Sequence, residues 1–249
     1  MTRVVGVNIV AAPCCGARYQ TSRYASMNFH AFEYWTDGWQ DSLYKPNDPG
    51  LRRCRCGRFL LMGELMHLET AETSDLPHID RVPDALLPEC IATADDVALE
   101  FAARLDHWHA LNHPYRKRYR THRAAEEANT RVAWEAAHPD RRTWWDRLLR
   151  RKAPVYTRPP GSPFTFPAFQ PNEEQLRNMA RLSEILVAWR DAAERGYTLE
   201  LAELYREQGR FVEARQAMSR IDPREAGVTS RLIGQLIEER EVAPMRYQM

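Results

Sequence analysis

Four of the five cysteines stand as two close pairs, Cys14 with Cys15 and Cys54 with Cys56. Thiolates are favoured zinc ligands, and two thiolates on one tight turn can reach a single ion at about 2.3 Å. Two such turns complete a tetrahedral site, and a glycine after the second cysteine permits each turn. Close pairs within an odd total fit reduced thiols or a metal better than a framework of disulfides.

The two turns read Ala12-Pro13-Cys14-Cys15-Gly16 and Arg53-Cys54-Arg55-Cys56-Gly57. Each resembles the C-P-x-C-G knuckle of bacterial zinc ribbons. Each also departs from it, because the first thiol positions hold Ala12 and Arg53 if Cys15 and Cys56 occupy the second. Two interpretations stay open. Some subset of the four cysteines binds a structural zinc ion, with His30 or His67 supplying a missing ligand, or the ribbon has lost its ion and keeps buried or paired thiols.

Basic and aromatic residues alternate in the middle of the chain, between residues 115 and 123, and a second basic stretch follows at 141–152. Such a surface can neutralise phosphates while its rings stack on bases, and it can also lie on an anionic membrane. The bland alternative is a solvated face, or contact with the acidic segment of the same chain. The candidate partner-binding residues are Arg116, Lys117, Arg118, Arg120, Trp144 and Trp145.

Catalytic signatures are weak. His109 and His113 are spaced i and i+4, so they could share an ion on a helix, but no third ligand is placed beside them. Cys90 has no local partner, and no phosphate-binding glycine loop or dinucleotide fingerprint is present. An enzyme would require Glu33, Asp37, His30 and the cysteines to converge in one pocket. The sequence favours binding over catalysis.

Residues 1–63 predict a small antiparallel sheet. β-branched residues at Val4–Val10 and the run from Met27 to Trp35 indicate strands. Asp37-Gly38 suits a tight hairpin turn, with residues 39–44 as the returning strand. Residues 64–92 are acidic and interrupted by prolines, which predicts a linker or short helical turns over the surface.

Residues 93–152 predict a helical segment with basic patches. Thr93 can cap its first helix, with Asp95 and Asp96 in the first turn, and Pro114 should end or kink that helix. Further helices are expected over 115–137 and 141–152. Six prolines make residues 153–171 an extended connector.

Residues 172–249 predict a helical domain. Asn172 and Gln175 form a capping pattern for a long helix, and helices over 198–208, 211–220 and 224–241 follow. Residues 201–215 resemble the junction of a tetratricopeptide repeat, in which small Ala202 and Ala214 let two helices approach. The resemblance implies a helical surface of the kind that binds proteins.

The 249-residue chain has 44% hydrophobic residues and a net charge of only +1, but its charge is unevenly distributed. Segment 64–103 carries one basic and ten acidic residues, whereas segment 104–158 carries fourteen basic and six acidic residues. No apolar run approaches the roughly 20 residues that span a bilayer, and no secretory signal is evident, so we expect a cytoplasmic protein.

The segment from Ser26 to Gly38, set between the two cysteine turns, resembles uncharacterised bacterial proteins with a zinc-ribbon-like N-terminus and a helical C-terminus. The expected fold class is α+β, with a zinc-ribbon-like module before a mainly helical body that contains a tetratricopeptide-like hairpin. The expected function is non-catalytic binding of another protein, as an adaptor or as an inhibitor such as a toxin-neutralising immunity protein. The alternative is nucleic-acid binding by the basic aromatic helices at 115–152, and a small-molecule substrate is not expected.

Overall fold

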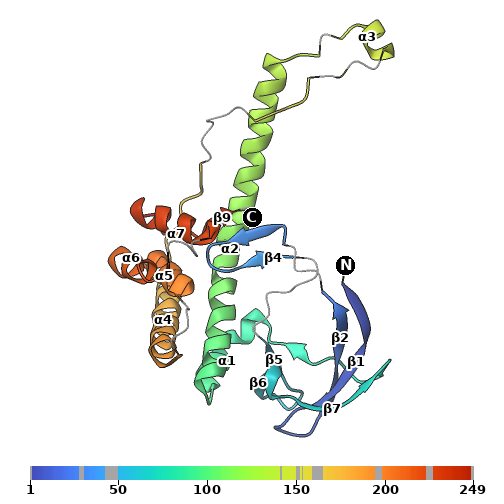
Figure 1. Ribbon diagram of the computed structural model, residues 1–249, viewed down its shortest axis with the longest axis vertical. Coiled ribbons are helices and arrows are strands. Elements are labelled where there is room, and N and C mark those ends of the chain that lie inside the picture. Colours follow the sequence, from blue (N-terminus) through green and yellow to red (C-terminus); the bar gives the residue numbers. More distant parts are fainter. Residues whose placement is uncertain are drawn as a thin grey trace. The chain divides into compact units, whose positions relative to one another are not determined.

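The computed structural model describes residues 2–27, 31–42, 50–140, 142–149, 152, 154–158, 165–193, 198–222 and 227–247. Three small antiparallel sheets and a set of helices make up these residues (Figure 1), which confirms the expected α+β class. The chain divides into two compact units. The first combines Met1–Asn112 with Gln170–Met249, and the second is His113–Phe169.

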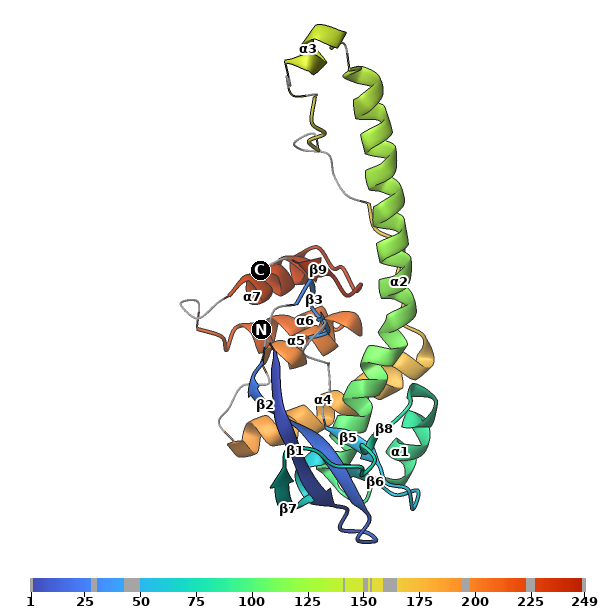
Figure 2. The same ribbon diagram turned by 90° about the vertical axis from the view of Figure 1, so that its right-hand side faces the viewer.

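The sheet with the longest strands has the order β2-β1-β7. Its long β1–β2 hairpin is drawn in blue in Figure 2. Strand β1 (Arg3–Ala11) pairs with β2 (Arg18–Ser26) on one side and with β7 (Met66–Ala71) on the other. The strand predicted at Val4–Val10 is therefore confirmed. Gly6 lies at a bulge with φ of 142°, and a Cβ there would lie 2.5 Å from the carbonyl oxygen of Ala71, so only glycine fits.

The other two sheets are shorter. Strands β5 (Leu51–Arg53), β6 (Phe59–Leu61) and β8 (Asp80–Arg81) form one sheet in the order β6-β5-β8. Strands β3 (Glu33–Trp35), β4 (Gln40–Asp41) and β9 (Arg246–Tyr247) form the other, in the order β4-β3-β9. The last sheet thus pairs a strand near the C-terminus with an N-terminal hairpin.

The hairpin predicted around Asp37-Gly38 is present, but its strands are shorter than expected. The N–H of Trp35 donates to the carbonyl of Trp39 at 2.9 Å, and Gly38 has φ of 81°. The first strand begins only at Glu33 and the returning strand ends at Asp41. The predicted strand residues 28–30 and 43–44 lie outside the described part of the chain.

The segment 64–92, predicted as a linker or short helical turns, contains η2 (Asp84–Leu86), most of helix α1 (Leu87–Thr93) and the end of the 3-10 turn η1 (Met62–Glu64). Unlike the prediction, it also supplies β7 and β8 to two sheets. Five of the six residues of β7 are exposed, so the strand lacks the alternation that would reveal it. Pairing with β1, distant in sequence, fixes it instead.

Helix α2 (Val97–Ala137) differs from the prediction at both its start and its middle. Its cap is Asp96, whose Oδ1 accepts the N–H groups of Ala98 at 2.7 Å and Leu99 at 2.9 Å. Thr93 instead ends α1 and donates to the carbonyl of Glu89. Pro114 does not end the helix. Asn112 before the proline and Tyr115 after it are both fully buried, and such packing can hold a helix through a proline.

The second unit contains the rest of α2, helix α3 (Trp144–Leu148) and the proline-rich connector. Where described, the connector has no regular structure, as predicted, but it returns along α2. Its contacts run in reverse order, from the Tyr156 ring on Trp134 (5.7 Å) to the Phe169 ring on Tyr115 (4.8 Å). The Phe166 ring stacks on Tyr119 between them at 5.7 Å. The connector is thus an aromatic strap over one face of the helix.

The C-terminal helices match the prediction closely. They are α4 (Glu173–Ala193), α5 (Thr198–Glu207), α6 (Phe211–Met218) and α7 (Val228–Glu238). Asn172 Oδ1 accepts the N–H of Gln175 at 2.8 Å, and Gln175 Oε1 accepts the N–H of Asn172 at 3.0 Å, which is the expected capping box. Ala202 and Ala214 are fully buried between α5 and α6. The predicted helical hairpin is confirmed.

Candidate metal centre

The first cysteine turn closes the β1–β2 hairpin. The N–H of Ala12 donates to the carbonyl of Ala17, and the N–H of Gly16 donates to the carbonyl of Ala12, both at 2.9 Å. Gly16 has φ of 69°, in the left-handed region that favours glycine. These bonds hold Cys14 and Cys15 at the tip of the hairpin.

The second cysteine turn closes the β5–β6 hairpin in a related way. The N–H of Cys54 donates to the carbonyl of Arg58, and the N–H of Gly57 donates to the carbonyl of Cys54, both at 2.8 Å. Cys54 and Cys56 therefore sit on one tight turn. The two hairpins belong to different sheets, and nothing in their local sequence fixes how the turns face each other.

The structure brings all four sulfurs together, within 4.8 Å of one another. Cys14 Sγ lies 3.5 Å from Cys56 Sγ, and Cys15 Sγ lies 3.4 Å from Cys54 Sγ. These separations exclude disulfide bonds of about 2.05 Å and are close to the roughly 3.8 Å edge of a tetrahedron with metal–sulfur bonds of about 2.3 Å. All four are free thiols. We call this group the cysteine cluster.

The surroundings of the cysteine cluster favour a thiolate at Cys54. Burial raises the pKa of Cys54, but the N–H of Cys56, the hydroxyl of Tyr19 and the neighbouring thiols donate to its sulfur, and the result is a pKa of about 6. Tyr19 accepts the N–H of Arg55 at 2.9 Å and lies 3.3 Å from Cys54 Sγ, so its own hydrogen is available to that sulfur.

Cys14 and Cys15 stay protonated in the absence of a cation. Burial, and hydrogen bonds with the other cysteines, raise the pKa of Cys14 to about 12. The pKa of Cys15 is also raised: the N–H of Ala17 lowers it, but the bond with Cys54 and desolvation outweigh this. Four crowded sulfurs cannot all ionise without a cation among them, since like charges repel. The donor set fits a soft divalent metal.

The structure resolves which residues belong to the cysteine cluster. All four cysteines take part, including adjacent Cys14 and Cys15. His67 lies on β7 with its Nε2 3.3 Å from Thr70 Oγ1, and it is not among the clustered ligand atoms. His30, the other predicted replacement ligand, lies outside the described residues. Glu33 and Asp37 do not join the cluster either.

An apolar core packs against the buried side of the cysteine cluster. Cys54 is buried, Cys14 is partly buried, and Cys15 and Cys56 are exposed. The buried side chains packed together with Cys54 come from both hairpins and from the segment before β8: Val10, Ala12, Ala17, Tyr19, Leu60 and Ile79. Apolar packing and the contacts between the sulfurs therefore join the two turns at the same place.

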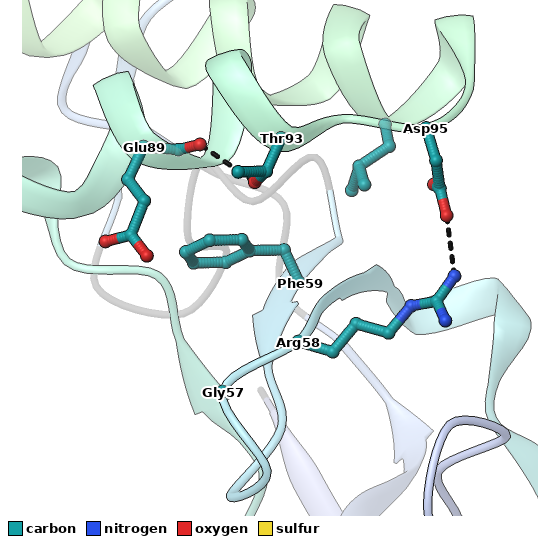
Figure 3. A pocket seen from close by; sticks show the side chains of 7 residues that line it. Gly57, Arg58, Phe59, Glu89, Thr93 and Asp95 are labelled. Carbon is teal, nitrogen blue, oxygen red and sulfur yellow. Dashed lines mark hydrogen bonds and ion pairs between the residues drawn. The ribbon is translucent and has the colours of Figure 1, made fainter.

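A pocket of about 230 Å³ lies between the second cysteine turn and the start of the helices (Figure 3). Phe59 and Leu99 line it together with Glu89, and the Arg58–Asp95 ion pair, at 2.6 Å, closes one side. The Thr93 hydroxyl at this rim donates to the carbonyl of Glu89. Among the described residues, the cysteine cluster alone brings together three or more side chains that could hold a metal ion.

The predicted partner-binding residues are placed differently from one another. Arg116 is fully buried, whereas Lys117 and Arg118 are exposed and Arg120 is partly exposed. The interleaved rings of Tyr115 and Tyr119 are buried under the strap, so they cannot stack on bases. This part of the nucleic-acid hypothesis is corrected, and the reason is the returning connector. Trp144 and Trp145 remain exposed.

The other residues with possible chemical roles, two histidines and Cys90, already have partners or are buried. His109 Nε2 lies 2.9 Å from the backbone oxygen of Asp37, and His107 Nε2 lies 3.1 Å from Glu174 Oε1. Cys90 is buried in the core, where burial raises its pKa to about 11, so it is an unreactive thiol. Glu100 of the acidic segment forms an ion pair with Arg104 of the basic segment. It also pairs with Arg181, which lies outside that segment.

Sequence reasoning missed a second cluster of ionisable groups, which we call the carboxylate cluster. It contains three fully or almost fully buried acids, Asp37, Glu203 and Glu207. Asn112 Nδ2 donates at 3.1 Å to both Asp37 Oδ2 and Glu207 Oε2, and Trp108 Nε1 donates to Glu207 at 2.9 Å. No local motif signals this cluster, because its members come from a hairpin turn, α2 and α5.

One buried arginine balances part of the carboxylate cluster. Arg206 Nε donates to Glu203 at 2.8 Å, and its Nη2 donates to the carbonyl of Ala243 at 2.9 Å. Burial, with the nearby charges of Glu203 and Asp37, raises the pKa of Glu207 well above its ordinary value. The cluster thus joins the C-terminal segment to the N-terminal hairpin.

Comparison of the chain with protein-family models, with curated proteins and with solved structures finds no match. The structure itself shows a cysteine cluster near the N-terminus, followed by a helical body. Among the described residues, no helix is long and apolar enough to cross a bilayer.

Proposed function

We propose that the protein is a non-catalytic binding protein whose N-terminal sheets are stapled by one structural zinc ion on Cys14, Cys15, Cys54 and Cys56. The observation that carries the metal assignment is the mutual approach of the four sulfurs within 4.8 Å at two glycine-containing hairpin turns. Four thiolates suit zinc, which accepts tetrahedral sulfur coordination and undergoes no redox change.

A structural role follows from the number of ligands. Four cysteines fill a tetrahedral site, so no position would be open for water or substrate. The ion would instead join the β1–β2 hairpin to the β5–β6 hairpin, which share only a small apolar core. Binding free energy at such a site is folding free energy.

Binding of another protein is supported by the helical part of the first unit. Helices α4 to α6 enclose a surface pocket of about 200 Å³ lined by Val187, Tyr205, Glu213, Gln216, Ala217 and Arg220. This lining combines apolar and charged side chains, as protein-recognition surfaces do. An adaptor or an inhibitor of another protein would use such a surface without any catalytic group.

The zinc assignment is tested by metal analysis of the full chain. We expect one zinc per chain by mass spectrometry, and a cobalt-substituted form with the absorption bands of tetrahedral thiolate coordination. Cys54→Ser should lose the metal, whereas Cys90→Ser, a matched change of a buried thiol outside the cluster, should keep it. A metal-free wild type with two disulfides would overturn the assignment.

The binding role is tested by mass spectrometry of proteins that co-purify with the tagged chain, with and without nuclease. We expect one stoichiometric protein that survives nuclease and is lost with Gln216→Ala/Arg220→Glu. The exposed Arg177→Glu, elsewhere on α4, is the matched charge control. Recovery of nucleic acid, or of proteins lost on nuclease treatment, would contradict the proposal.

A further inference from the structure

Helix α3 presents four large apolar side chains to solvent. Trp144 is 63% exposed, Trp145 58%, Leu148 63% and Leu149 65%. The two indoles stack on each other, with ring centroids 3.8 Å apart. Scattered exposed apolar residues are normal, but four within six consecutive positions form a patch that marks an interaction surface.

The four side chains share one side of the helix. The N–H of Leu149 donates to the carbonyl of Trp145 at 2.9 Å, so the helical turn continues to Leu149. At about 100° per residue, positions 144, 145, 148 and 149 fall within roughly 140° of the helix circumference. The intervening positions 146 and 147 fall on the other side. The patch is therefore an amphipathic face.

The sequence around this face is strongly basic. Residues 141–152 contain six basic residues and one acidic residue, a net charge of +5. In the second unit, α3 follows the end of α2 (Figure 1), and its four apolar side chains are exposed. A partner for this segment must therefore combine an apolar surface with negative charge.

We propose that α3 and its basic flanks dock onto an anionic lipid surface. Helices that lie in the membrane interface combine tryptophan and leucine on one face with a sequence rich in arginine and lysine. Residues 141–152 have this composition. Indole rings prefer the headgroup level, and basic side chains are attracted to anionic lipids. Charge complementarity thus selects the occupant of this face.

Nucleic acid fits the same region less well. Phosphates would satisfy the positive charge and the indoles could stack on bases, but Leu148 and Leu149 would gain nothing from a polar, charged ligand. The aromatic rings of the neighbouring basic stretch, Tyr115 and Tyr119, are already covered by the strap. The apolar half of the patch is what favours lipid.

The test is co-sedimentation of the full chain with vesicles of phosphatidylcholine alone or mixed with phosphatidylglycerol. We expect binding only to the mixed vesicles, weakened by salt. Trp144→Ser/Leu148→Ser should weaken binding at least about tenfold. Arg147→Gln/Lys152→Gln should weaken it by roughly tenfold as well. The controls are the exposed pairs Val132→Ser/Val212→Ser and Arg177→Gln/Arg231→Gln, which should bind as wild type.

A second readout reports insertion directly. Brominated lipids should quench part of the tryptophan fluorescence of the wild type, and this part should disappear in Trp144→Phe/Trp145→Phe. Equal vesicle binding by wild type and the Trp144→Ser/Leu148→Ser variant would overturn the proposal. So would affinity for labelled single-stranded nucleic acid without vesicle binding, or a dimer that dissociates in the same variant. Zinc content does not enter either readout.

Discussion

The cysteine cluster and the carboxylate cluster both gather ionisable side chains from distant parts of the chain, but the fold treats them in opposite ways. The sulfurs lie at two hairpin tips, partly open to solvent, and crowd around a space that fits one metal ion. The carboxylates lie in the interior, where amide, indole and guanidinium groups already occupy their oxygens. The first arrangement leaves room for a ligand, and the second leaves none.

This difference shows what distinguishes a binding site from a structural network. In the cysteine cluster the sulfurs contact mainly each other, and together they could bind a metal ion. In the carboxylate cluster the protein itself supplies the partners: Arg206 pairs with Glu203, Asn112 donates to Asp37, and burial favours a proton on Glu207. Removal of a group should therefore change metal content in one cluster and stability alone in the other.

The largest expected effect is metal removal. A chelator, or Cys54→Ser, should lower the free energy of unfolding by on the order of 5 kcal/mol, since structural zinc contributes folding energy and only a small core otherwise joins the hairpins. Urea unfolding followed by circular dichroism measures it. Unchanged unfolding of a chelated sample that has demonstrably lost zinc would show that the core alone holds the turns.

The next effect concerns the carboxylate cluster. Glu207→Ala should cost about 3 kcal/mol, because it leaves the buried N–H of Trp108 and one N–H of Asn112 without that acceptor. Glu207→Gln keeps an acceptor oxygen and should stay within about 1 kcal/mol of wild type. Denaturant titrations compare the two variants, and zinc content should be normal in both. Equal losses would show that an amide of the same shape cannot replace the carboxyl group of Glu207 there.

Different acidic residues should control the stability of the protein at the acidic and the alkaline end of the pH range. The raised pKa of Glu207 means that the folded state holds a proton that the unfolded state loses above about 4.5, so stability should fall as pH rises from 4.5 through the folded pKa. Hydrogen bonds from Arg181 and Arg104 lower the pKa of Glu100 to about 2, so its contribution of roughly 1–2 kcal/mol should vanish as pH falls from 4.5 towards 2.

Matched glutamine variants separate these two slopes. Glu207→Gln should flatten the stability profile on the alkaline side only, and Glu100→Gln on the acidic side only. Unfolding free energies measured across the pH range check both. A wild-type slope on the alkaline side in Glu207→Gln would mean that another acid with a raised pKa, such as Glu200, carries it.

The smallest effect tests how the protein tunes its metal ligands. Tyr19→Phe removes the hydroxyl beside Cys54 and should weaken zinc binding about tenfold while the module stays folded, as expected for a group that supports a ligand. Competition with a zinc indicator measures the affinity. The matched control is Tyr24→Phe, an exposed tyrosine on the same strand, which should leave the affinity unchanged.

Local patterns predicted much of the fold. Strand β1, the turn at Gly38, the capping box at Asn172 and the helices from α4 to α7 all follow from residues within a few positions of one another. These features depend on backbone conformation and short-range hydrogen bonds, which sequence records directly. The cysteine pairs were visible for the same reason, since each pair lies on one turn.

Contacts between distant segments decided the rest. The facing of the two cysteine turns, the pairing of exposed β7 with β1, and the strap that buries Tyr115 and Tyr119 depend on partners far away in sequence. Glu207 is likewise expected from the sequence to be a charged surface residue, but α2 and the turn at Asp37 bury it. By itself the sequence determined which side chains each turn and helix carries, and the tertiary structure determined which of them meet, because burial and pairing are properties of the whole chain.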